Sequence, residues 1–515
     1  MKFIIALIIA FTPLSYWSQE PEIGESIKNI GAIKEIHVLN ENEILTTSIK
    51  QRIGRNKIVL EHFKNNIKLK EVPTPYRVNR SLGKFEDFIL VDGKGYAFIS
   101  DQAGKARNLY ISPLNLEDGE FGNSKFLIED PIPRNRQAPS AFQYAVSKNK
   151  KFLAVLVNTT LKDEKEFHYR YVIMDGKGEK VTEGSFKLNS EKELTKEFEF
   201  TVTNDKSLIV FHKEVRKESS GLFNSKVMLV SSHIYCMKKD FFKHINLNSE
   251  DDNIAYELDI VENDSTYYLH GFYQKSSLDA MNNKLQGVFF KRLDNQFKIE
   301  KSTYTNFPTN ILLIGFTEEE VKNQREDLAM RSFVVRNTLL DTTSRSIFGL
   351  SEQFYTLQES YPDSRGYLRT VTSYYYNDIL SYKFNYDGEL IWMNKSPKIQ
   401  TTINDRGYFS GYYSYLNNEG NPTVIFNDNK ANYLEDGSYK DPLKRKELAP
   451  KRSAYTTTKL ILDKDNGDKN FTEFIDEFER NYHLIPRMTR GDTSNNFCIM
   501  MIEGKTKTNF VKLVH

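Results

Sequence analysis

The segment Tyr382–Gln400 reads YKFNYDGELIWMNKSPKIQ and places an Asp-Gly pair between two runs of aromatic and branched residues. Such residues favour extended strands, and Asp-Gly readily adopts the positive φ angles of a tight hairpin turn. The segment therefore predicts a β-hairpin that turns at Asp387 and Gly388. Whether similar hairpins recur along the chain decides the fold.

Similar units recur at intervals of about 55 residues, as in a repeat architecture. Each unit has apolar residues on both sides of a short polar turn, and these turns centre on Glu41, Gly93, Asn149, Asp205, Asp264, Ser364 and Glu419. The interval from Asp264 to Ser364 is roughly double the others. Weaker hairpins follow at Gly176, Asn295 and Gly388. Two hairpins per interval give four strands, which is the content of one propeller blade.

The sequence thus predicts an all-β protein, a β-propeller of about seven four-stranded blades, with six or eight as alternative counts. Its 35 Phe and 29 Tyr residues suit half-buried strands. One sheet cannot bury both of its faces, whereas blades stacked in a ring cover these faces and leave only short edges. Tandem β-sandwich domains, which also use many short hairpins, are the alternative fold.

The propeller repeats are expected over residues 19–440. Residues 441–515 are expected to form a loop, a short amphipathic helix that begins near Asn470, and a closing hairpin of the same propeller that pairs with the start of the mature chain. A second helix is predicted from Thr317, within the long interval. Cys236 and Cys498 could form a disulfide or remain as buried thiols, and their spacing leaves both open.

The chain begins MKFIIALIIAFTPLSYWSQE, with one Lys, an apolar run, and then Pro with small or polar residues. This pattern is typical of a secretory signal peptide, and residues 1–18 are predicted to be removed after Ser18. The apolar run is shorter than the ~20 residues that span a bilayer, so no transmembrane segment is expected in the mature chain. The 71 Lys and Arg residues nearly balance the 69 Asp and Glu residues. Nucleic acid is therefore an unfavourable partner, since binding it requires a basic field.

The segment from Tyr382 onward also carries a wider motif. After the Asp-Gly turn come Trp-x-x-Lys, Pro-x-x-Gln, a Ser-Tyr strand and an Asn-Asp-Asn run, which are Asp387, Gly388, Trp392, Lys395, Pro397, Gln400, Ser414, Tyr415 and residues 427–429. This motif resembles a group of secreted Bacteroidetes proteins of unknown function. The resemblance implies an exported β-propeller-like protein, in the periplasm or at the surface of a Gram-negative bacterium, and it brings no catalytic residue.

The same segment is similar to the docking-Trp repeat of quinoprotein propellers, in which a Gly-containing turn precedes a strand Trp. That pattern must recur in most blades to hold the ring, and here it occurs once. Asp387, Gly388 and Trp392 are therefore expected to be structural, with Trp392 buried between blades.

The best metal candidate is the run DKDNGDKN, residues 463–470, where Asp463, Asp465 and Asp468 could offer hard oxygen ligands to calcium. The run does not match an EF-hand, because Gly467 and Phe474 fall where the spacing of that loop is wrong. The alternative is a solvated turn rich in Asp and Asn. No metalloprotease, nucleophile-elbow or phosphate-loop motif occurs, so no catalytic residue and no other cofactor are assigned.

These observations predict an exported, monomeric, non-enzymatic propeller that binds or scaffolds other envelope or surface proteins or glycans. The alternative is a hydrolase or lyase that acts on glycans or peptides, with acids from separate blades that meet at the mouth of the channel. Carboxylates or histidines that converge there with perturbed pKa values would favour the enzyme.

Overall fold

The structure is a computed structural model that describes residues 22–23, 27–28, 32–52, 55–78, 81–103, 106–131, 142–160, 166–188, 194–219, 225–239, 241–276, 284–314, 319, 322, 330–434, 439–440, 445–448, 454–473, 482–492, 497–503 and 507–514. The predicted signal peptide and almost all of the helix predicted from Thr317 lie outside these residues. In the described part of the chain, no helix is long and apolar enough to cross a membrane.

Eight sheets of four or more antiparallel strands contain most of the described residues. Blades 1 and 2 are β3 (Ala32–Asn40), β4 (Glu43–Arg52), β5 (Arg55–Lys64) and β6 (Ile67–Pro73), then β9 (Lys84–Val91), β10 (Lys94–Ala103), β11 (Ala106–Asn115), β12 (Glu120–Phe121) and β13 (Lys125–Asp130). Blades 3 and 4 are β14 (Phe142–Val146), β15 (Phe152–Asn158), β16 (Phe167–Asp175) and β17 (Lys180–Leu188), then β18 (Leu194–Val202), β19 (Leu208–Ser219), β20 (Ser225–Lys238) and β21 (Phe241–Asn246).

Blades 5 and 6 are β22 (Asn253–Asn263), β23 (Thr266–Lys275), β25 (Gly287–Leu293) and β26 (Ile299–Asn306), then β28 (Phe333–Asp341), β29 (Ser346–Pro362), β30 (Leu368–Asn385), β31 (Leu390–Ser396) and β32 (Thr401–Ile403). Blade 7 is β33 (Tyr413–Leu416), β34 (Pro422–Asn429), β35 (Tyr455–Leu462) and β36 (Lys469–Glu473). Blade 8 is β37 (His483–Leu484), β38 (Arg490–Asp492), β39 (Phe497–Glu503) and β40 (Lys507–Val514), with β1 (Glu22–Ile23) and β2 (Ile27–Lys28). The smaller elements are β7 (Arg77–Val78) paired with β8 (Ser81–Leu82), β24 (Lys284–Leu285) paired with β27 (Met330–Arg331), α1 (Thr309–Leu313), and the short helical turns η2 (Lys430–Asn432) and η5 (Pro486–Met488).

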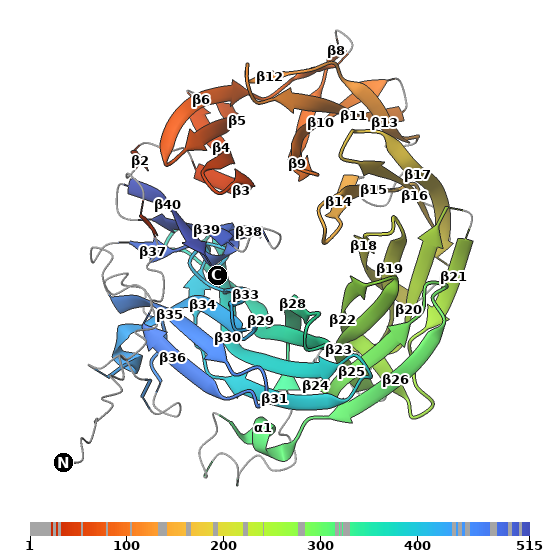
Figure 1. The fold of residues 1–515 in the computed structure, drawn as a ribbon, viewed down its shortest axis with the longest axis vertical. Coiled ribbons are helices and arrows are strands. Elements are labelled where there is room, and N and C mark those ends of the chain that lie inside the picture. The colour runs from red at the N-terminus through yellow and green to blue at the C-terminus, as the bar shows by residue number, and fades with distance from the viewer. Residues whose placement is uncertain are drawn as a thin grey trace, which may run out of the picture.

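Figure 1 shows the eight sheets as blades around a ring, with the first strand of blades 1 to 7 and β38 of blade 8 nearest the centre. Blade 8 joins segments from the two ends of the sequence, because β1 pairs with β40, with Glu22 opposite Lys512. The predicted β-propeller is therefore confirmed, and tandem sandwiches are excluded. The count of eight exceeds the central expectation of seven by the blade that joins the two end segments.

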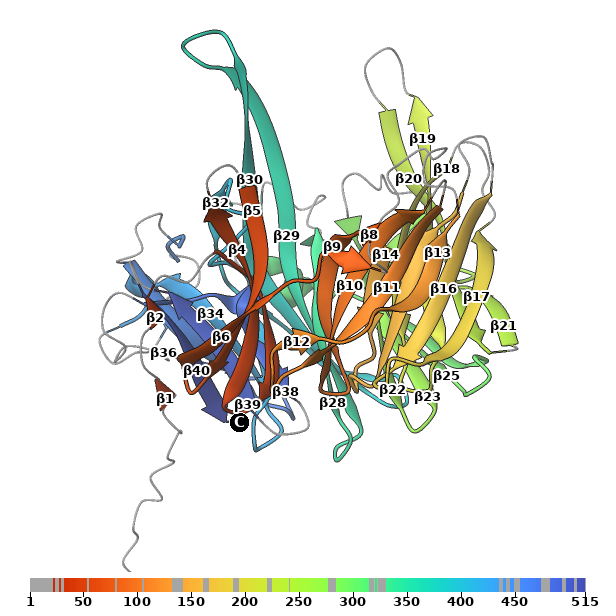
Figure 2. The same cartoon turned by 90° about the horizontal axis from the view of Figure 1, so that it is seen from above.

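Most of the predicted turns are confirmed, and one is wrong. The turns at Gly93, Asp205 and Asp264 join the first two strands of blades 2, 4 and 5. The turn at Ser364 instead joins β29 and β30, the middle strands of blade 6, at the end of a hairpin that projects from the ring (Figure 2). The first turn of that blade lies at residues 342–345. The long interval thus holds one blade with elongated middle strands, not two ordinary blades.

The helix predicted near Asn470 is wrong over its first residues. Lys469–Glu473 form β36, and β36 pairs with β35 from Leu462 to Thr458. Phe471 packs against the apolar cluster between blades 6 and 7. Three aromatic residues in a short window fit either period, and here the open edge of β35 selects the strand. Residues 474–481 lie outside the described part of the chain.

Apolar clusters fill the interfaces between blades, and Trp392 illustrates how the turns complete them. Trp392 on β31 is 8% exposed and packs with Phe348 of its own blade and Val424 of blade 7. Its indole Nε1–H donates a hydrogen bond to the carbonyl of Lys464 at 3.1 Å. Its ring lies so close to Gly467 that a Cβ there would be 2.8 Å from Trp392 Cδ2. The β35–β36 turn therefore caps the Trp of the preceding blade.

Similar capping turns join the third and fourth strands of blades 3, 5, 6 and 7. In each, a side-chain oxygen of the first Asp or Asn accepts backbone N–H groups of the turn; these residues are Asp175, Asp294, Asn385 and Asp463. In blade 6 only Gly388 of the Asp-Gly pair has a positive φ, of 79°. A Cβ at Gly388 would be 2.5 Å from Phe290 of blade 5, and the Asp387 carboxylate binds Arg292 of that blade at 2.9 Å. The Asp-Gly turn thus docks blade 6 on blade 5.

Candidate active site in the central channel

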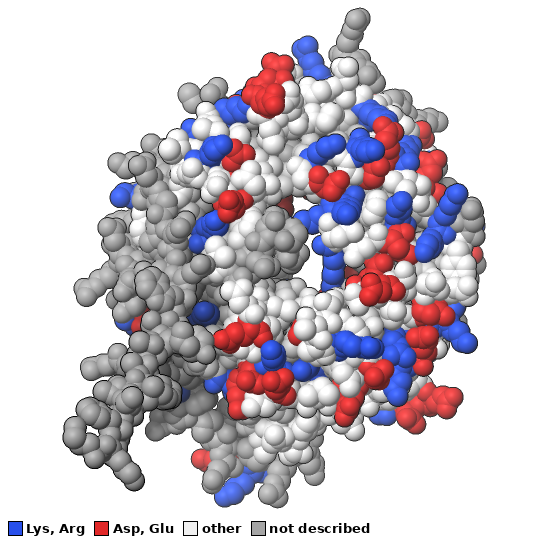
Figure 3. Space-filling model, in the orientation of Figure 1, with Lys and Arg blue, Asp and Glu red and all other residues white. Residues whose placement is uncertain are grey.

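The inner strands of the blades surround an opening at the centre of the ring. Figure 3 shows this opening, with Lys and Arg side chains along one side of it. Ligand sites of ring-shaped and barrel folds lie where such strands and their turns converge. The ionisable side chains of these strands are therefore the first place to look for chemistry.

Two carboxylates on neighbouring blades have perturbed pKa values. Burial raises the pKa of Glu35 on β3, and the nearby charge of Asp87 raises it further, while Arg490 on β38 opposes both. Burial also raises the pKa of Asp87 on β9, and Glu86 adds to the effect. The Arg490 Nη2 atom lies 3.8 Å from Glu35 Oε1, and both side chains keep about two-fifths of their surface exposed, 42% and 41%. The pair is thus held in a low-dielectric setting and still reachable from solvent.

A β-bulge lies beside each of these carboxylates. The pairing of β3 with β4 shifts register between Ile33 and Glu35, and the pairing of β9 with β10 leaves Glu86 as the extra residue next to Asp87. A bulge bends its strand and re-aims the adjacent side chain, which is why bulges are frequent next to active sites. The two bulges set the direction of the acidic side chains in blades 1 and 2.

Tyr144 on β14 contributes a hydroxyl beside the acids. Its OH is buried and, among the described residues, has no hydrogen-bond partner. Burial raises the pKa of Tyr144, and the charges of Glu86 and Asp87 raise it further. A buried hydroxyl without a partner costs about 1–3 kcal/mol. Tyr144 is therefore a donor or acceptor available to a bound ligand.

Two lysines of the β14–β15 turn cross the interior of the ring in different directions. Lys148 Nζ lies 3.2 Å from the Asp259 carboxylate of blade 5, and Lys150 Nζ donates to the carbonyl of Gly491 in blade 8 at 2.9 Å. Burial opposes ionisation of Asp259, but Lys148 and His270 outweigh it and lower the pKa of Asp259. These lysines place positive charge across the channel from the Glu35 and Asp87 pair.

A buried relay runs from Asp259 into the interface of blades 5 and 6. The Thr338 hydroxyl donates its proton to Asp259, so the Nε2–H group of His270 must donate to Thr338 Oγ1, at 2.9 Å. The other ring nitrogen, Nδ1, then accepts from the Tyr382 hydroxyl at 2.9 Å. His270 is 0% exposed, and burial lowers its pKa to about 4. The imidazole is neutral near pH 7 and fixed in one tautomer.

The sequence did not single out any of these channel residues. Glu35, Asp87, Tyr144 and Arg490 are far apart in the chain, and none belongs to a motif. Each follows or precedes ordinary strand residues, so nothing in local spacing marks it. The signal that could have found them is the equivalent placement of polar residues in the first strand of successive repeats.

The calcium candidates Asp463, Asp465 and Asp468 lie in the β35–β36 turn. Asp463 Oδ1 accepts the backbone N–H groups of Asp465 and Asn466, at 2.8 and 3.0 Å, and Asp468 Oδ2 accepts from the Asn466 side chain at 2.9 Å. Among the described residues, no group of three or more His, Cys, Asp or Glu side chains could hold a metal ion. Calcium binding at this turn stays a prediction, and the hydrogen bonds of the turn account for its Asp and Asn content.

The two cysteines lie in different blades. Cys236 on β20 and Cys498 on β39 are both buried and free, and burial raises the pKa of each thiol. The structure therefore selects the buried thiols from the two alternatives left open by the sequence.

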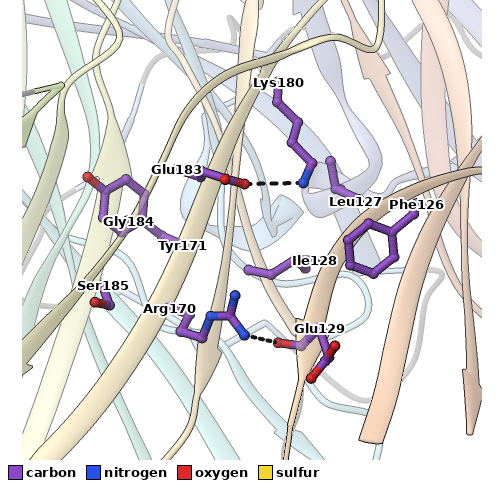
Figure 4. Close-up of a pocket in the computed structure, with 10 residues that line it drawn as sticks. All are labelled: Phe126, Leu127, Ile128, Glu129, Arg170, Tyr171, Lys180, Glu183, Gly184 and Ser185. Carbon is purple, nitrogen blue, oxygen red and sulfur yellow. Dashed lines mark hydrogen bonds and ion pairs between the residues drawn. The ribbon is translucent and has the colours of Figure 1, made fainter. Parts of the chain in front are cut away.

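A separate groove of about 310 Å³ lies at the outer rim, between blades 2 and 3. Figure 4 shows Lys180 and Arg170 extending toward the same space from opposite sides, with Ile128 between them. Lys180 Nζ lies 3.1 Å from the Glu183 carboxylate and 5.0 Å from the centre of the Phe126 ring. Its lining residues include no paired acids of raised pKa, so the channel is the stronger candidate for chemistry.

No protein-family model and no curated protein matches the chain. Solved structures match it at low similarity. A prolyl endopeptidase structure is 10% identical with a TM-score of 0.34 and aligns over 77% of this chain and 54% of its own, so the chain spans about half of that protein. The polysaccharide lyase Uly1 is 10% identical with a TM-score of 0.33, over 96% and 99% of the two chains. The α-L-arabinanase of Penicillium chrysogenum, complexed with arabinobiose, is 8% identical with a TM-score of 0.30, over 64% and 94%. Similarities this low carry no inference about activity, which has to come from the residues of this chain.

Proposed function

We propose that the protein is a glycan-cleaving propeller enzyme, a hydrolase or lyase, with its acid–base pair in the channel. The observation that carries this proposal is the raised pKa of Glu35 and Asp87, two neighbouring carboxylates beside Arg490. Sequence reasoning favoured a non-enzymatic binding protein, but no contact in the described residues supports that role specifically. Perturbed carboxylates that converge in a cleft support the enzyme instead.

The two carboxyl groups share the work because neighbouring negative charges repel, so one holds a proton while the other is ionised. Arg490 lies beside Glu35 and favours the charge there. Asp87 is then the proton donor to the leaving oxygen, and Glu35 is the base. A pair of carboxyl groups with separated pKa values is the arrangement that glycosidic-bond cleavage requires. Arg490 and the Tyr144 hydroxyl bind substituents of the sugar at the reacting bond.

The test uses the chain from residue 19 to 515 on a panel of neutral and acidic polysaccharides. New reducing ends report cleavage, and absorbance of unsaturated products separates a lyase from a hydrolase. We expect Glu35→Gln and Asp87→Asn to lower the rate by at least about 100-fold, the usual contribution of a general acid or base. Glu359→Gln, on the exposed part of β29, is the matched control and should keep full activity. Equal rates in all variants, or no cleavage of any polysaccharide, would refute the proposal.

We also propose that the protein is exported, on the basis of the signal-peptide pattern of residues 1–18. Expression of the full chain in a Gram-negative host should release a form that begins at Gln19. N-terminal sequencing of the periplasmic and medium fractions measures this. An uncleaved chain in the cytoplasm would contradict it.

A further inference from the structure

Three histidines lie side by side in blade 4, on strands β19, β20 and β21. The rings of His212 and His233 are stacked with their centres 6.2 Å apart, and the centres of His233 and His244 are 4.9 Å apart. β21 is the outermost strand of its blade (Figure 1), so this cluster is distant from the channel. The proposed activity makes no use of it.

Two ring nitrogens of this cluster face each other. His244 Nε2 lies 3.1 Å from His233 Nδ1. Metal–nitrogen bonds of about 2.0–2.1 Å place two imidazole nitrogens about 3.3 Å apart around a tetrahedral ion such as zinc. Around a square-planar nickel or copper ion the spacing is about 2.9 Å. The observed separation falls between these values.

Neighbouring side chains hold both rings in place. The Ser231 hydroxyl donates to Glu214 Oε2 at 2.5 Å, so its oxygen accepts the Nε2–H group of His233, at 2.9 Å. The lone pair of His233 then lies on Nδ1, the nitrogen that faces His244. The ring of His244 is stacked on Tyr235, with centres 4.6 Å apart and planes 11° apart. Metal-binding histidines commonly donate their second nitrogen to such a polar partner, which fixes the tautomer.

The site is open to solvent on one side. His244 is exposed, and the His233 side chain is 13% exposed. An ion can therefore reach the facing nitrogens without rearrangement of the backbone. His244 Nε2 gives up the proton it shares with His233 by changing to its other neutral tautomer, so both nitrogens present lone pairs.

We propose that His233 Nδ1 and His244 Nε2 bind one divalent transition-metal ion, such as zinc or nickel, at the outer edge of blade 4. Water completes the coordination shell, since the protein supplies two ligands. Glu214 and Ser231 act as positioning residues through the opposite nitrogen of His233. Hard cations such as calcium and magnesium do not bind here, because they require oxygen ligands.

The test is isothermal titration of zinc and nickel chloride into metal-free protein that carries no histidine tag. We expect one ion per chain, and at least about 10-fold weaker binding in Glu214→Gln, the usual effect of removing such a positioning residue. His244→Asn should abolish the binding, and as an exposed substitution it should leave the thermal midpoint of the metal-free protein unchanged. His168→Asn, which removes a histidine of blade 3, is the matched control.

Three outcomes would overturn the proposal: no binding by the unaltered protein, unchanged binding in His244→Asn, or an equal loss in His168→Asn. Glu35→Gln should bind the ion normally, because the channel lies on the inner strands. Metal binding and polysaccharide cleavage can therefore fail independently.

Discussion

The buried imidazole of His270 makes the stability of the propeller depend on pH in a defined direction. Burial lowers the pKa of His270 from 6.5 to about 4. The unfolded chain thus takes up a proton below pH 6.5 at this residue, while the folded protein does so only below about pH 4. The contribution of His270 to stability is complete above pH 6.5 and is lost as the pH falls toward 4. The total is about 3 kcal/mol, at about 1.4 kcal/mol per pKa unit.

The perturbation is His270→Gln, which removes the titrating group. Between pH 7.5 and pH 5.0 the unaltered protein should lose about 2 kcal/mol more stability than the variant, because pH 5.0 lies about 1.5 units below the unfolded pKa. The variant also loses the hydrogen bonds to Thr338 and Tyr382, but that loss is the same at both pH values. All other titrating groups, including the buried His37, are common to both proteins and cancel in the comparison.

The assay is urea unfolding at the two pH values, together with NMR titration of the histidine ring signals in the folded protein. The signal of His270 is the one that disappears in His270→Gln, and it should remain in the neutral form down to pH 5. A titration midpoint near 6.5, or an equal loss of stability in both proteins, would show that His270 is not held neutral by burial. His244→Gln, at the exposed end of the blade 4 cluster, controls for the loss of a histidine.

Further predictions concern the interface of blades 6 and 7 and a second buried group. Trp392→Ala should lower the free energy of unfolding by about 3–5 kcal/mol, and Trp392→Phe by less, because the alanine leaves a cavity under the capping turn; urea unfolding measures both. Gly467→Ala should also destabilise the protein, by more than about 1 kcal/mol, since its φ is +78° and a Cβ would meet Trp392; an unchanged midpoint would contradict the capping role. Burial raises the pKa of Asp428 from 3.8 to about 6, so its contribution to stability is largest below pH 3.8 and is lost as the pH rises to 6. Thermal melts from pH 4.5 to 6.5 should therefore show a less favourable trend for the unaltered protein than for Asp428→Asn.

The fold could be predicted because it repeats, and the errors arose where the repeat was irregular. Turns such as Gly93 and Asp205 have strong local signals, since apolar strands flank a polar turn on both sides. The error at Ser364 came from a hairpin whose strands extend far beyond the ring, so that its tip imitated the first turn of a blade. The helix predicted near Asn470 failed because pairing with β35, a tertiary effect, overrides a short helical pattern.

The candidate site could not be predicted for a different reason. Glu35, Asp87 and Arg490 come together only when blades 1, 2 and 8 are placed in the ring. Their function depends on burial and on the charge of neighbours from other blades, and neither property is encoded in nearby residues. Calcium at Asp463 was suggested by composition alone, and the same composition serves the hydrogen bonds of a capping turn.

The pairing of β1 with β40 has a consequence for the order in which the ring assembles. Blades 1 to 7 follow one another along the chain, but blades 8 and 1 meet only through non-covalent contacts, such as the hydrogen bonds between Asn66 and the backbone of Phe510. Contacts with so great a sequence separation form late, because every intervening segment must first be ordered. The seam between these two blades is therefore the last part of the ring to close and the first place where it can open. A covalent link engineered across this seam would act as a lock, converting a ring that can unzip into one that cannot.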